Sequence, residues 1–416
     1  MSKYIVVGGK KIVGETRVHG AKNAVLPILA ATVLNGNINV LYDIPKLSDV
    51  EIMTKILRAV GCRVSREGEA LVVDSTDLNS HEVPEDLVRE MRSSFIFLGA
   101  ILARHGSVKI SYPGGCEIGH RPIDLHLKAL REMGAEIEEK HGFLYCKAKK
   151  LKGCDIHLDF PSVGATENVI LAAVFAEGIT VIRNAAREPE IVDLENFINA
   201  MGGKVSGAGS ANIYIEGVKE LHAVEHRIIP DRIVAGTYLI AAAITKGEIL
   251  LTNVVPDHMQ SILHKLRETG CRIDTNSNQI RLIAPERIKA IDTIQTLPYP
   301  GYPTDMQSQM MSLMTLSNGV TVFIENIFEN RYKHTEELNR MGANIKVDGR
   351  IALIRGVEKL SGATVTSKDL RGGAALILAA LAAEGTTVVD NAKHVDRGYD
   401  HLHEVLYALG ANIRKM

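Results

Sequence analysis

A glycine closes a helix-like segment six times along the chain, at intervals of 68 to 73 residues. Each of these glycines precedes a short strand-like stretch, as in ILRAVGCRV and KLRETGCRI. The six positions are Gly61, Gly134, Gly202, Gly270, Gly342 and Gly410. A period of this length is too long for a thin solenoid repeat, and it fits a βαβαββ unit that packs its helix against neighbouring units. The pattern predicts an α/β protein built from six such units.

The first helix of most units is apolar on nearly every side, as in residues 24–34 and 374–383. Helices of this kind are usually buried. At 416 residues the chain is longer than one hydrophobic core usually supports, and six units divide naturally into three plus three. We therefore expect two domains, each with a core of buried helices.

The two ends of the chain indicate where these domains meet. The sixth unit stops at 411–416, before the paired strands that complete the other units, and residues 3–20 have the pattern of those missing strands. We expect one domain at 22–229 and a second at 1–21 plus 230–416, closed by the N-terminal strands. Two chain crossings would join them and form a hinge.

Charge and cysteine content exclude several classes of protein. A formal net charge of −1 provides no basic surface for nucleic acid. The apolar runs are shorter than the roughly 20 residues that span a bilayer, and no signal peptide pattern precedes the first strand, so we expect a cytoplasmic protein with no membrane contact. Five cysteines without a C-x-x-C pair favour neither disulfides nor zinc, and no metal or cofactor is expected. Four of them are predicted to lie in or near the core: Cys62, Cys146, Cys154 and Cys271.

The fifth cysteine, Cys116, lies in an unusually long connection. From turn glycine to closing glycine the second unit has 28 residues, whereas the others have 23 to 25. The extra length falls in the segment 112–122, whose prolines and glycines predict a surface loop. A lone loop cysteine is usually inert. Flanking glycines would expose this thiol, however, and the nearby His120 and Arg121 would lower its pKa, which favours a catalytic role.

Cations occupy equivalent positions in several units. Three stand where the first helix of a unit begins and three where the second helix begins: Lys22, Arg92 and Arg371, then Arg121, Arg331 and Arg397. The positive end of a helix dipole favours anions, so cations at these positions indicate an anionic ligand in a cleft onto which the helix ends converge. Each one taken alone also fits an ordinary surface ion pair.

Asp305 occupies the helix-start position of the fifth unit. The helix dipole favours a carboxylate there, so a capping role is one interpretation. A general base that faces the same cleft as the arginines is the other. The two roles are compatible.

Several motifs together resemble those of one enzyme family. They are Gly20-Ala-Lys-Asn-Ala, Pro113-Gly-Gly-Cys, Ser162-Val-Gly-Ala-Thr, Pro303-Thr-Asp-Met-Gln and Phe328-Glu-Asn-Arg. In this order and spacing they resemble the UDP-N-acetylglucosamine 1-carboxyvinyltransferases, which are enolpyruvyl transferases of peptidoglycan synthesis. The resemblance covers essentially the whole chain. It implies two inside-out α/β barrel domains, each of three βαβαββ repeats around buried parallel helices.

The resemblance also implies an activity. Such an enzyme transfers the enolpyruvyl group of phosphoenolpyruvate to the 3'-hydroxyl of UDP-N-acetylglucosamine and releases phosphate. Cys116 would be the proton donor, would carry a covalent adduct with phosphoenolpyruvate, and would be alkylated by the inhibitor fosfomycin. Asp305 would be the base, and Lys22 and Arg397 would complete the catalytic set.

Binding residues follow from the same resemblance. Those implied for phosphoenolpyruvate are Lys22, Asn23, Arg121, Arg331, Arg371 and Arg397. Those implied for UDP-N-acetylglucosamine are Asn23, Arg92, Arg121, Pro122, Ile123, Asp124, Leu125, Ser162, Val163, Gly164, Asp305 and Ile327. Phe160 departs from the family pattern. It lies just before the Ser162-Val-Gly motif, in a segment where many members carry a lysine. A lysine contact to the nucleotide is therefore not expected there.

Two alternatives remain open at this stage. The sister enzyme that acts on shikimate 3-phosphate would share the fold and the donor, but it lacks a cysteine loop and typically has Ser-Lys-Ser where this chain has Ala21-Lys22-Asn23. A non-catalytic paralogue that binds a sugar nucleotide would share the fold but would not catalyse the reaction.

Overall fold

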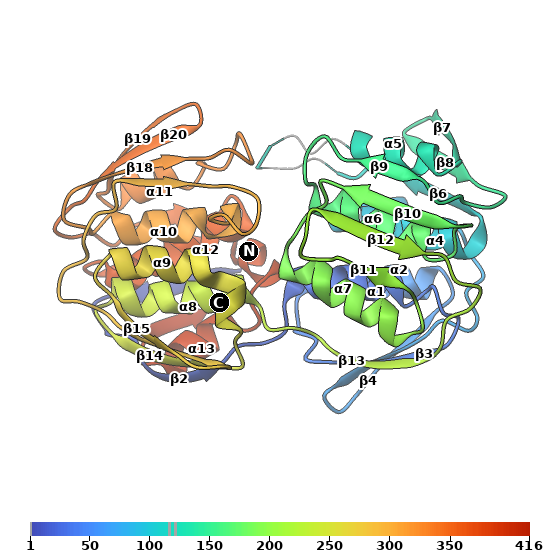
Figure 1. The fold of residues 1–416 in the computed structure, drawn as a ribbon. Helices are drawn as coiled ribbons and strands as arrows, with labels where there is room; N and C mark the ends of the chain where they lie inside the picture. Colours follow the sequence, from blue (N-terminus) through green and yellow to red (C-terminus); the bar gives the residue numbers. More distant parts are fainter. Residues whose placement is uncertain (1, 115–117, 120–122) are drawn as a thin grey trace. The chain divides into compact units, whose positions relative to one another are not determined.

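The computed structural model describes residues 2–114, 118–119 and 123–416. They form two compact units (Figure 1). Among the described residues, unit 1 comprises 2–19, 118–119 and 230–416, and unit 2 comprises the remainder. Each unit has a hydrophobic core of its own. The fold is the predicted mixed α/β arrangement of helices and small sheets.

Unit 2 packs its helices against three small sheets. Helix α1 begins at Lys22, and eight of the other nine residues of the helix are buried, as its apolar sequence predicts. The helices are α1 (Lys22–Ala31), α2 (Ser48–Ala59), α3 (Glu85–Glu90), η1 (Arg92–Ile96), α4 (Phe97–His105), α5 (Asp124–Glu132), α6 (Val163–Ala173) and α7 (Pro189–Ala200). The sheet orders are β13-β3-β5-β4, β6-β8-β7 and β11-β12-β10-β9. The strands are β3 (Ile38–Tyr42), β4 (Arg63–Glu67), β5 (Ala70–Asp74), β6 (Ser107–Ser111), β7 (Glu136–Lys140), β8 (Phe143–Lys147), β9 (Asp155–His157), β10 (Ile179–Arg183), β11 (Val205–Ser206), β12 (Asn212–Glu216) and β13 (Val224–Arg227).

Unit 1 repeats this plan, and α8 lies beside α9, α10 and α12 within it (Figure 1). Its helices are α8 (Arg232–Ile244), η2 (Pro256–Met259), α9 (Gln260–Glu268), η3 (Thr304–Met306), α10 (Gln307–Met314), α11 (Thr335–Arg340), α12 (Leu370–Ala382), η4 (Ala392–Arg397) and α13 (Leu402–Ala408). The sheet orders are β15-β16-β14-β2, β17-β18-β20-β19 and β21-β22-β1-β23. The strands are β1 (Lys3–Val7), β2 (Val13–Arg17), β14 (Glu248–Thr252), β15 (Arg272–Thr275), β16 (Gln279–Ile283), β17 (Thr293–Gln295), β18 (Val320–Ile324), β19 (Asn344–Asp348), β20 (Ile351–Arg355), β21 (Thr364–Thr366), β22 (Thr386–Asp390) and β23 (Asn412–Lys415).

The closing glycines have the same backbone conformation in all six βαβαββ repeats. Their φ angles lie between 91° and 106°, just after the second helix of the unit has ended. Only glycine adopts this left-handed conformation without strain, and it commonly terminates helices. Gly247 is required for a different reason, because a Cβ atom there would lie 1.9 Å from the backbone oxygen of Ile12. The repeat read from the sequence is therefore a structural repeat.

The N-terminal strands complete two sheets rather than one. Strand β1 pairs antiparallel with both β22 and β23 of the sixth unit. Strand β2 pairs in parallel with β14 of the fourth unit. The expectation that residues 3–20 complete only the sixth unit was therefore wrong for β2. In unit 2, strand β13 likewise pairs in parallel with a strand of a different repeat, β3.

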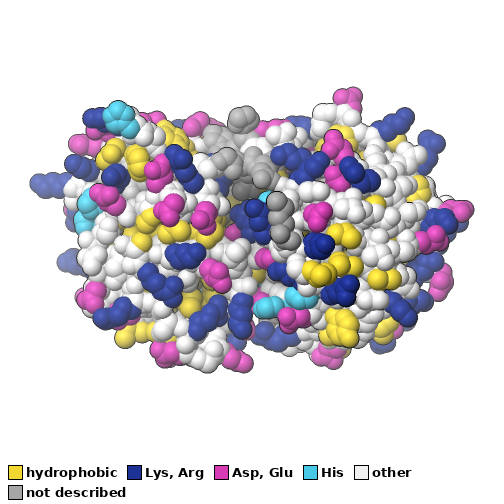
Figure 2. All heavy atoms as spheres, turned by 180° about the vertical axis from the view of Figure 1, so that it is seen from behind, with side chains coloured by type: hydrophobic (Ala, Val, Ile, Leu, Met, Phe, Trp, Pro, Cys, Tyr) yellow, Lys and Arg dark blue, Asp and Glu magenta, His cyan; other side chains and the backbone are white. Residues whose placement is uncertain are grey.

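The visible surface carries charges of both signs. On the face drawn in Figure 2, Lys and Arg side chains alternate with Asp and Glu side chains over each unit. This mixture agrees with the formal net charge of −1. Among the described segments, every helix is too short or too polar to span a lipid bilayer.

Candidate active site

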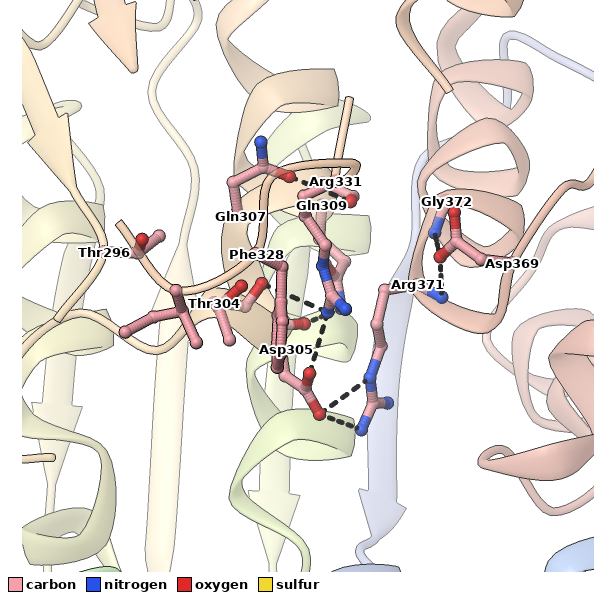
Figure 3. Close-up of polar contacts among 12 residues, drawn as sticks. Thr296, Thr304, Asp305, Gln307, Gln309, Phe328, Arg331, Asp369, Arg371 and Gly372 are labelled. Carbon is pink, nitrogen blue, oxygen red and sulfur yellow. Dashed lines mark hydrogen bonds and ion pairs between the residues drawn. The ribbon is translucent and has the colours of Figure 1, made fainter. Parts of the chain in front are cut away.

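In unit 1, the carboxylate of Asp305 lies against two arginines (Figure 3). Arg331 Nη2 donates to Asp305 Oδ1 at 2.7 Å. Arg371 donates to Asp305 Oδ2 from Nη2 at 2.8 Å and from Nε at 3.2 Å. Asp305 lies in the first turn of η3, at the helix start where both interpretations placed it, and its carboxylate makes no described capping bond to that helix. Three residues far apart in the sequence thus meet in one charged cluster.

The two guanidinium groups are almost completely buried. The side chains of Arg331 and Arg371 are 3% exposed, whereas that of Asp305 is 27% exposed. Burial, the largest single influence, would lower the pKa of Arg371, but Asp305, Tyr399 and Asp231 together outweigh it and raise the pKa above its ordinary value. The centre of each guanidinium also lies over an aromatic ring, that of Phe328 at 5.7 Å and that of Tyr399 at 5.5 Å. Two cations that directly contact one carboxylate keep an attraction for a further anion.

Helix caps fix the position of Arg371. Asp369 precedes α12 and its Oδ1 accepts from the backbone nitrogens of Arg371 at 3.0 Å and Gly372 at 2.8 Å. Asp231 caps α8 in the same way, with its Oδ1 bonded to the nitrogens of Ile233 at 2.8 Å and Val234 at 3.0 Å. A capped first turn holds its side chains in one orientation. Arg371 is therefore directed at Asp305 by the start of its own helix.

In unit 2, Lys22 is the first residue of α1 and its ammonium group is largely buried. Lys22 Nζ lies 3.1 Å from Asp49 Oδ2, and the Asp49 side chain is 1% exposed. A cation at this end of a helix opposes the helix dipole. Asp49 compensates that charge. Asn23 follows in the same turn and is half-buried.

Three segments predicted to bind the sugar nucleotide lie close together in unit 2. Helix α5 begins at Asp124 and α6 begins at Val163, and His126 Nδ1 of α5 lies 2.9 Å from Asn168 Nδ2 of α6. A Cβ atom at Gly164 would lie 3.2 Å from His126 Cε1, so the starts of the two helices are in close contact. Arg92, at the start of η1, is near enough to influence the charge of His126.

His126 should make the stability of the protein depend on pH. Burial, and secondly the positive charge of Arg92, lowers its pKa to about 3. Because this value lies below that of an exposed histidine, unfolded chains bind more protons between pH 6.5 and pH 3, and folding is opposed as the pH falls. We expect His126 to reduce the free energy of unfolding by about 3 kcal/mol between pH 7 and pH 4. Denaturant titrations of the native protein and of His126→Gln at both pH values measure this contribution.

The exposed residue His157 provides the control. His157→Gln should leave the loss of stability between pH 7 and pH 4 unchanged, whereas His126→Gln should reduce it. Equal losses in all three proteins would contradict the neutral, buried state of His126.

Two cations lie differently from the prediction. Arg331 and Arg397 were expected where the second helix of a unit begins. Arg331 instead lies four residues before α11, and Arg397 is the last residue of η4, five residues before α13. In both of these βαβαββ repeats the chain makes a turn before the second helix starts. The spacing of apolar residues does not reveal that turn. Arg397 is half-buried.

The remaining predicted residues are distributed as follows. Ser162 caps α6 and accepts from the Ala165 nitrogen at 3.4 Å, and Val163 and Gly164 form the first turn of that helix. Ile123 and Leu125 flank the start of α5, and Ile327 follows β18 in unit 1. Cys116, Arg121 and Pro122 lie outside the described residues. The four cysteines predicted near the core are buried or half-buried, and burial raises the pKa of Cys62 and of Cys146 to about 12.

The sequence reading missed several polar residues around Asp305. Gln309 Nε2 donates to the Asp305 backbone oxygen at 2.8 Å and lies 3.2 Å from the Tyr399 hydroxyl. Glu325 is fully buried at the end of β18. Gln307 and Gln309 lie in a wholly buried helix, and such polar residues need partners. The contrast between these polar side chains and their buried helix was the sequence signal that could have identified them.

Comparison with known proteins agrees with this site. The model of the EPSP synthase (3-phosphoshikimate 1-carboxyvinyltransferase) family matches residues 6–406. A UDP-N-acetylglucosamine 1-carboxyvinyltransferase 2 of Caldanaerobacter subterraneus is 55% identical over 413 residues, which cover 99% of both chains. A UDP-N-acetylglucosamine 1-carboxyvinyltransferase 1 of Carboxydothermus hydrogenoformans is 51% identical over 416 residues, which cover 100% of this chain and 99% of the relative.

Solved structures agree on the fold. The enolpyruvyl transferase NikO from Streptomyces tendae aligns with a TM-score of 0.90 at 24% identity, covering 100% of this chain and 99% of its own. EPSP synthase from Acinetobacter baumannii aligns with a TM-score of 0.77 at 17% identity, covering both chains completely. Taken with the full-length relatives, these matches show that the chain belongs to the enolpyruvyl transferase family, among the UDP-N-acetylglucosamine 1-carboxyvinyltransferases.

Proposed function

We propose that this protein transfers the enolpyruvyl group of phosphoenolpyruvate to the 3'-hydroxyl of UDP-N-acetylglucosamine, with release of phosphate, in cytoplasmic peptidoglycan synthesis. The choice of acceptor rests on the names of relatives about half identical over nearly the whole chain. The observation that carries the chemistry is the Asp305 carboxylate at the buried guanidinium groups of Arg331 and Arg371. It supplies a base and an anion-binding site in one cluster.

The reaction needs three proton transfers. The acceptor oxygen bonds to C2 of phosphoenolpyruvate while C3 takes up a proton, and a base removes the proton of the attacking hydroxyl. The tetrahedral intermediate then loses a proton from C3 and expels phosphate, which restores the double bond. We assign the base to Asp305 and the acid to Cys116. Both steps require fixed cations around a trianionic donor.

The buried arginines suit the carboxylate of the donor. Arg331 and Arg371 already hold one carboxylate, that of Asp305, with charge-assisted hydrogen bonds. A carboxylate that accepts such bonds from two cations is a weak base. We propose that the donor carboxylate takes its place on the guanidinium groups, and that Asp305 is thereby released to act on the acceptor hydroxyl.

Further assignments follow the family. The phosphate of the donor would be bound by Lys22, Arg121 and Arg397, with Asn23 beside it. For the sugar nucleotide we propose Arg92 with the two adjoining helix starts of unit 2, and Ile327 and Asp305 in unit 1. The residues at those helix starts and in the segment before α5 are Arg121, Pro122, Ile123, Asp124, Leu125, Ser162, Val163 and Gly164.

Phosphate release distinguishes this proposal from its alternatives. Phosphoenolpyruvate is incubated with the protein and either UDP-N-acetylglucosamine or shikimate 3-phosphate, and free phosphate is measured. Release only with the sugar nucleotide is expected. Release only with shikimate 3-phosphate would assign the protein to the sister reaction. If neither acceptor causes release although the sugar nucleotide binds, the protein is a non-catalytic paralogue.

Variants of Cys116 test the proposed acid and the proposed sensitivity to fosfomycin. Aspartate retains an acidic proton, so Cys116→Asp should keep turnover and lose inactivation by fosfomycin. Serine is a far weaker acid, so Cys116→Ser should lower turnover by about a hundredfold or more. Phosphate release before and after exposure to fosfomycin measures both effects. Undiminished turnover in Cys116→Ser would remove the assignment.

A further inference from the structure

We propose that Glu325 is a positioning residue of this reaction. Its buried carboxyl group fixes the positions of Asp305 and Arg331 relative to each other. The proposal rests on the function assigned above. Glu325 directly follows β18 and has 0% exposure. The described hydrogen bonds place it between the segment that leads into Asp305 and the segment that leads into Arg331.

The position of Glu325 follows from two parallel strands. Strands β17 and β18 pair in parallel, with Gln295 opposite Ile324. The next residues, Thr296 and Glu325, therefore leave the same edge of the sheet side by side. Thr296 Oγ1 donates to Glu325 Oε1 at 2.9 Å, which fastens the two strand ends together.

The carboxylate then binds both departing segments. Its Oε1 accepts from the backbone nitrogens of Ile327 at 2.8 Å and Phe328 at 3.1 Å. Its Oε2 accepts from Thr304 Oγ1 at 3.0 Å. Thr304 is the residue before Asp305, and the ring of Phe328 lies 5.7 Å from the guanidinium carbon of Arg331. One carboxylate thus supports the two partners of the central ion pair from opposite sides.

Thr304 connects the two sides directly. Its hydroxyl donates to Glu325, and its backbone oxygen accepts from Arg331 Nη2 at 3.3 Å. Figure 3 shows Thr304 next to Asp305, with Arg331 and Phe328 adjacent. Loss of the hydroxyl bond would let Thr304 rotate, and the base would move with it.

Stability alone does not account for a carboxyl side chain at this position. Among the described residues, the groups that bond to its carboxyl oxygens are two hydroxyls and two backbone amides, all uncharged. Burying a carboxylate costs several kcal/mol, and an apolar side chain of similar volume is often no less stable. Precise placement of reacting groups does account for it, because an error of about 1 Å can cost a hundredfold in rate.

A single hydroxyl provides the sharpest test. Thr304→Val removes only the bond to Oε2 and keeps the side-chain shape and the bonds to Ile327 and Phe328. We expect kcat to fall about tenfold, with KM for phosphoenolpyruvate within about twofold and a nearly unchanged melting temperature. Thr387→Val is the matched control, because Thr387 is buried in β22 of the same unit and its hydroxyl has no hydrogen-bond partner within the described structure.

Variants of Glu325 distinguish a role in positioning the reacting groups from a role in folding alone. Glu325→Gln keeps one acceptor oxygen for the hydroxyl of Thr296 and the two amides, and its NH2 group donates to Thr304, so kcat should stay within about threefold. Glu325→Ala should lower kcat at least as much as Thr304→Val and raise KM for the sugar nucleotide, because Ile327 loses its support.

Equal kcat values for Thr304→Val and Thr387→Val would overturn the proposal. So would a Glu325→Ala protein that melts earlier and turns over normally. If Glu325→Ala does not fold, the two threonine variants still decide. All are assayed with whichever acceptor the native enzyme uses, so a wrong acceptor assignment is detected separately from a wrong role for Glu325.

Discussion

Replacing Asp305 with Asn should lower kcat by about a thousandfold while phosphoenolpyruvate binds at least as tightly as before. An amide cannot accept the proton of the attacking hydroxyl, and loss of a general base typically costs 10²- to 10⁴-fold. The amide also competes less well than a carboxylate for Arg331 and Arg371, so the donor finds these cations more accessible. Phosphate release at saturating acceptor gives kcat, and isothermal titration with phosphoenolpyruvate gives the affinity.

Asp274 provides the control for this variant, because it is an exposed carboxylate of the same unit that is paired with Arg272. Asp274→Asn should behave as the native enzyme. Asp305→Asn should also unfold more easily, because two buried guanidinium groups lose their partner at a cost of up to about 3–5 kcal/mol. The assays therefore belong well below its melting temperature. An Asp305→Asn enzyme that retains a tenth of native turnover would refute the assignment of the base.

Replacing Arg371 with Met should lower kcat/KM for phosphoenolpyruvate by about a thousandfold. Met fills a similar volume and removes the two hydrogen bonds that the guanidinium gives to a carboxylate, each worth about 1.5–3 kcal/mol when charged. The same change leaves Asp305 with Arg331 as its remaining described guanidinium partner. KM for the sugar nucleotide should change far less, and steady-state kinetics with each substrate varied in turn makes the comparison.

Arg340 is a suitable reference for this change, since its side chain is 63% exposed. Arg340→Met should leave both KM values unaltered. Arg371→Lys keeps the charge and loses the planar pair of donors, so it should recover only part of the lost affinity. If Arg371→Met binds phosphoenolpyruvate normally, the donor carboxylate is held elsewhere.

Most of the architecture could be predicted from glycines and apolar runs. Gly61 and its five equivalents terminate helices through a backbone conformation that other residues avoid, so the sequence marks the repeat directly. The partner of β2 could not be predicted in this way. Pairing with β14 depends on where two distant strands meet, and the alternation of apolar residues is the same for either sheet.

The candidate site was predictable in its charged residues and not in their support. Arg371 and Asp305 stand out because charges at helix starts need an explanation, and Arg331 was predicted from its repeated position although it lies four residues before α11. The bond between Asp305 and both arginines depends on side-chain directions that spacing does not give. Glu325 looks like an ordinary residue after a strand, and its role emerges only when Thr296 and Thr304 are found beside it.

The pairing of β1 with β22 and β23 has a consequence for biosynthesis. Residues 3–7 leave the ribosome long before their partners at 386–390 and 412–415. Strand β1 must therefore wait unpaired while more than 370 intervening residues are translated, and residues 20–229 can already fold in that time. Such a long delay favours slow completion of unit 1 and makes the nascent chain dependent on protection of its first strand.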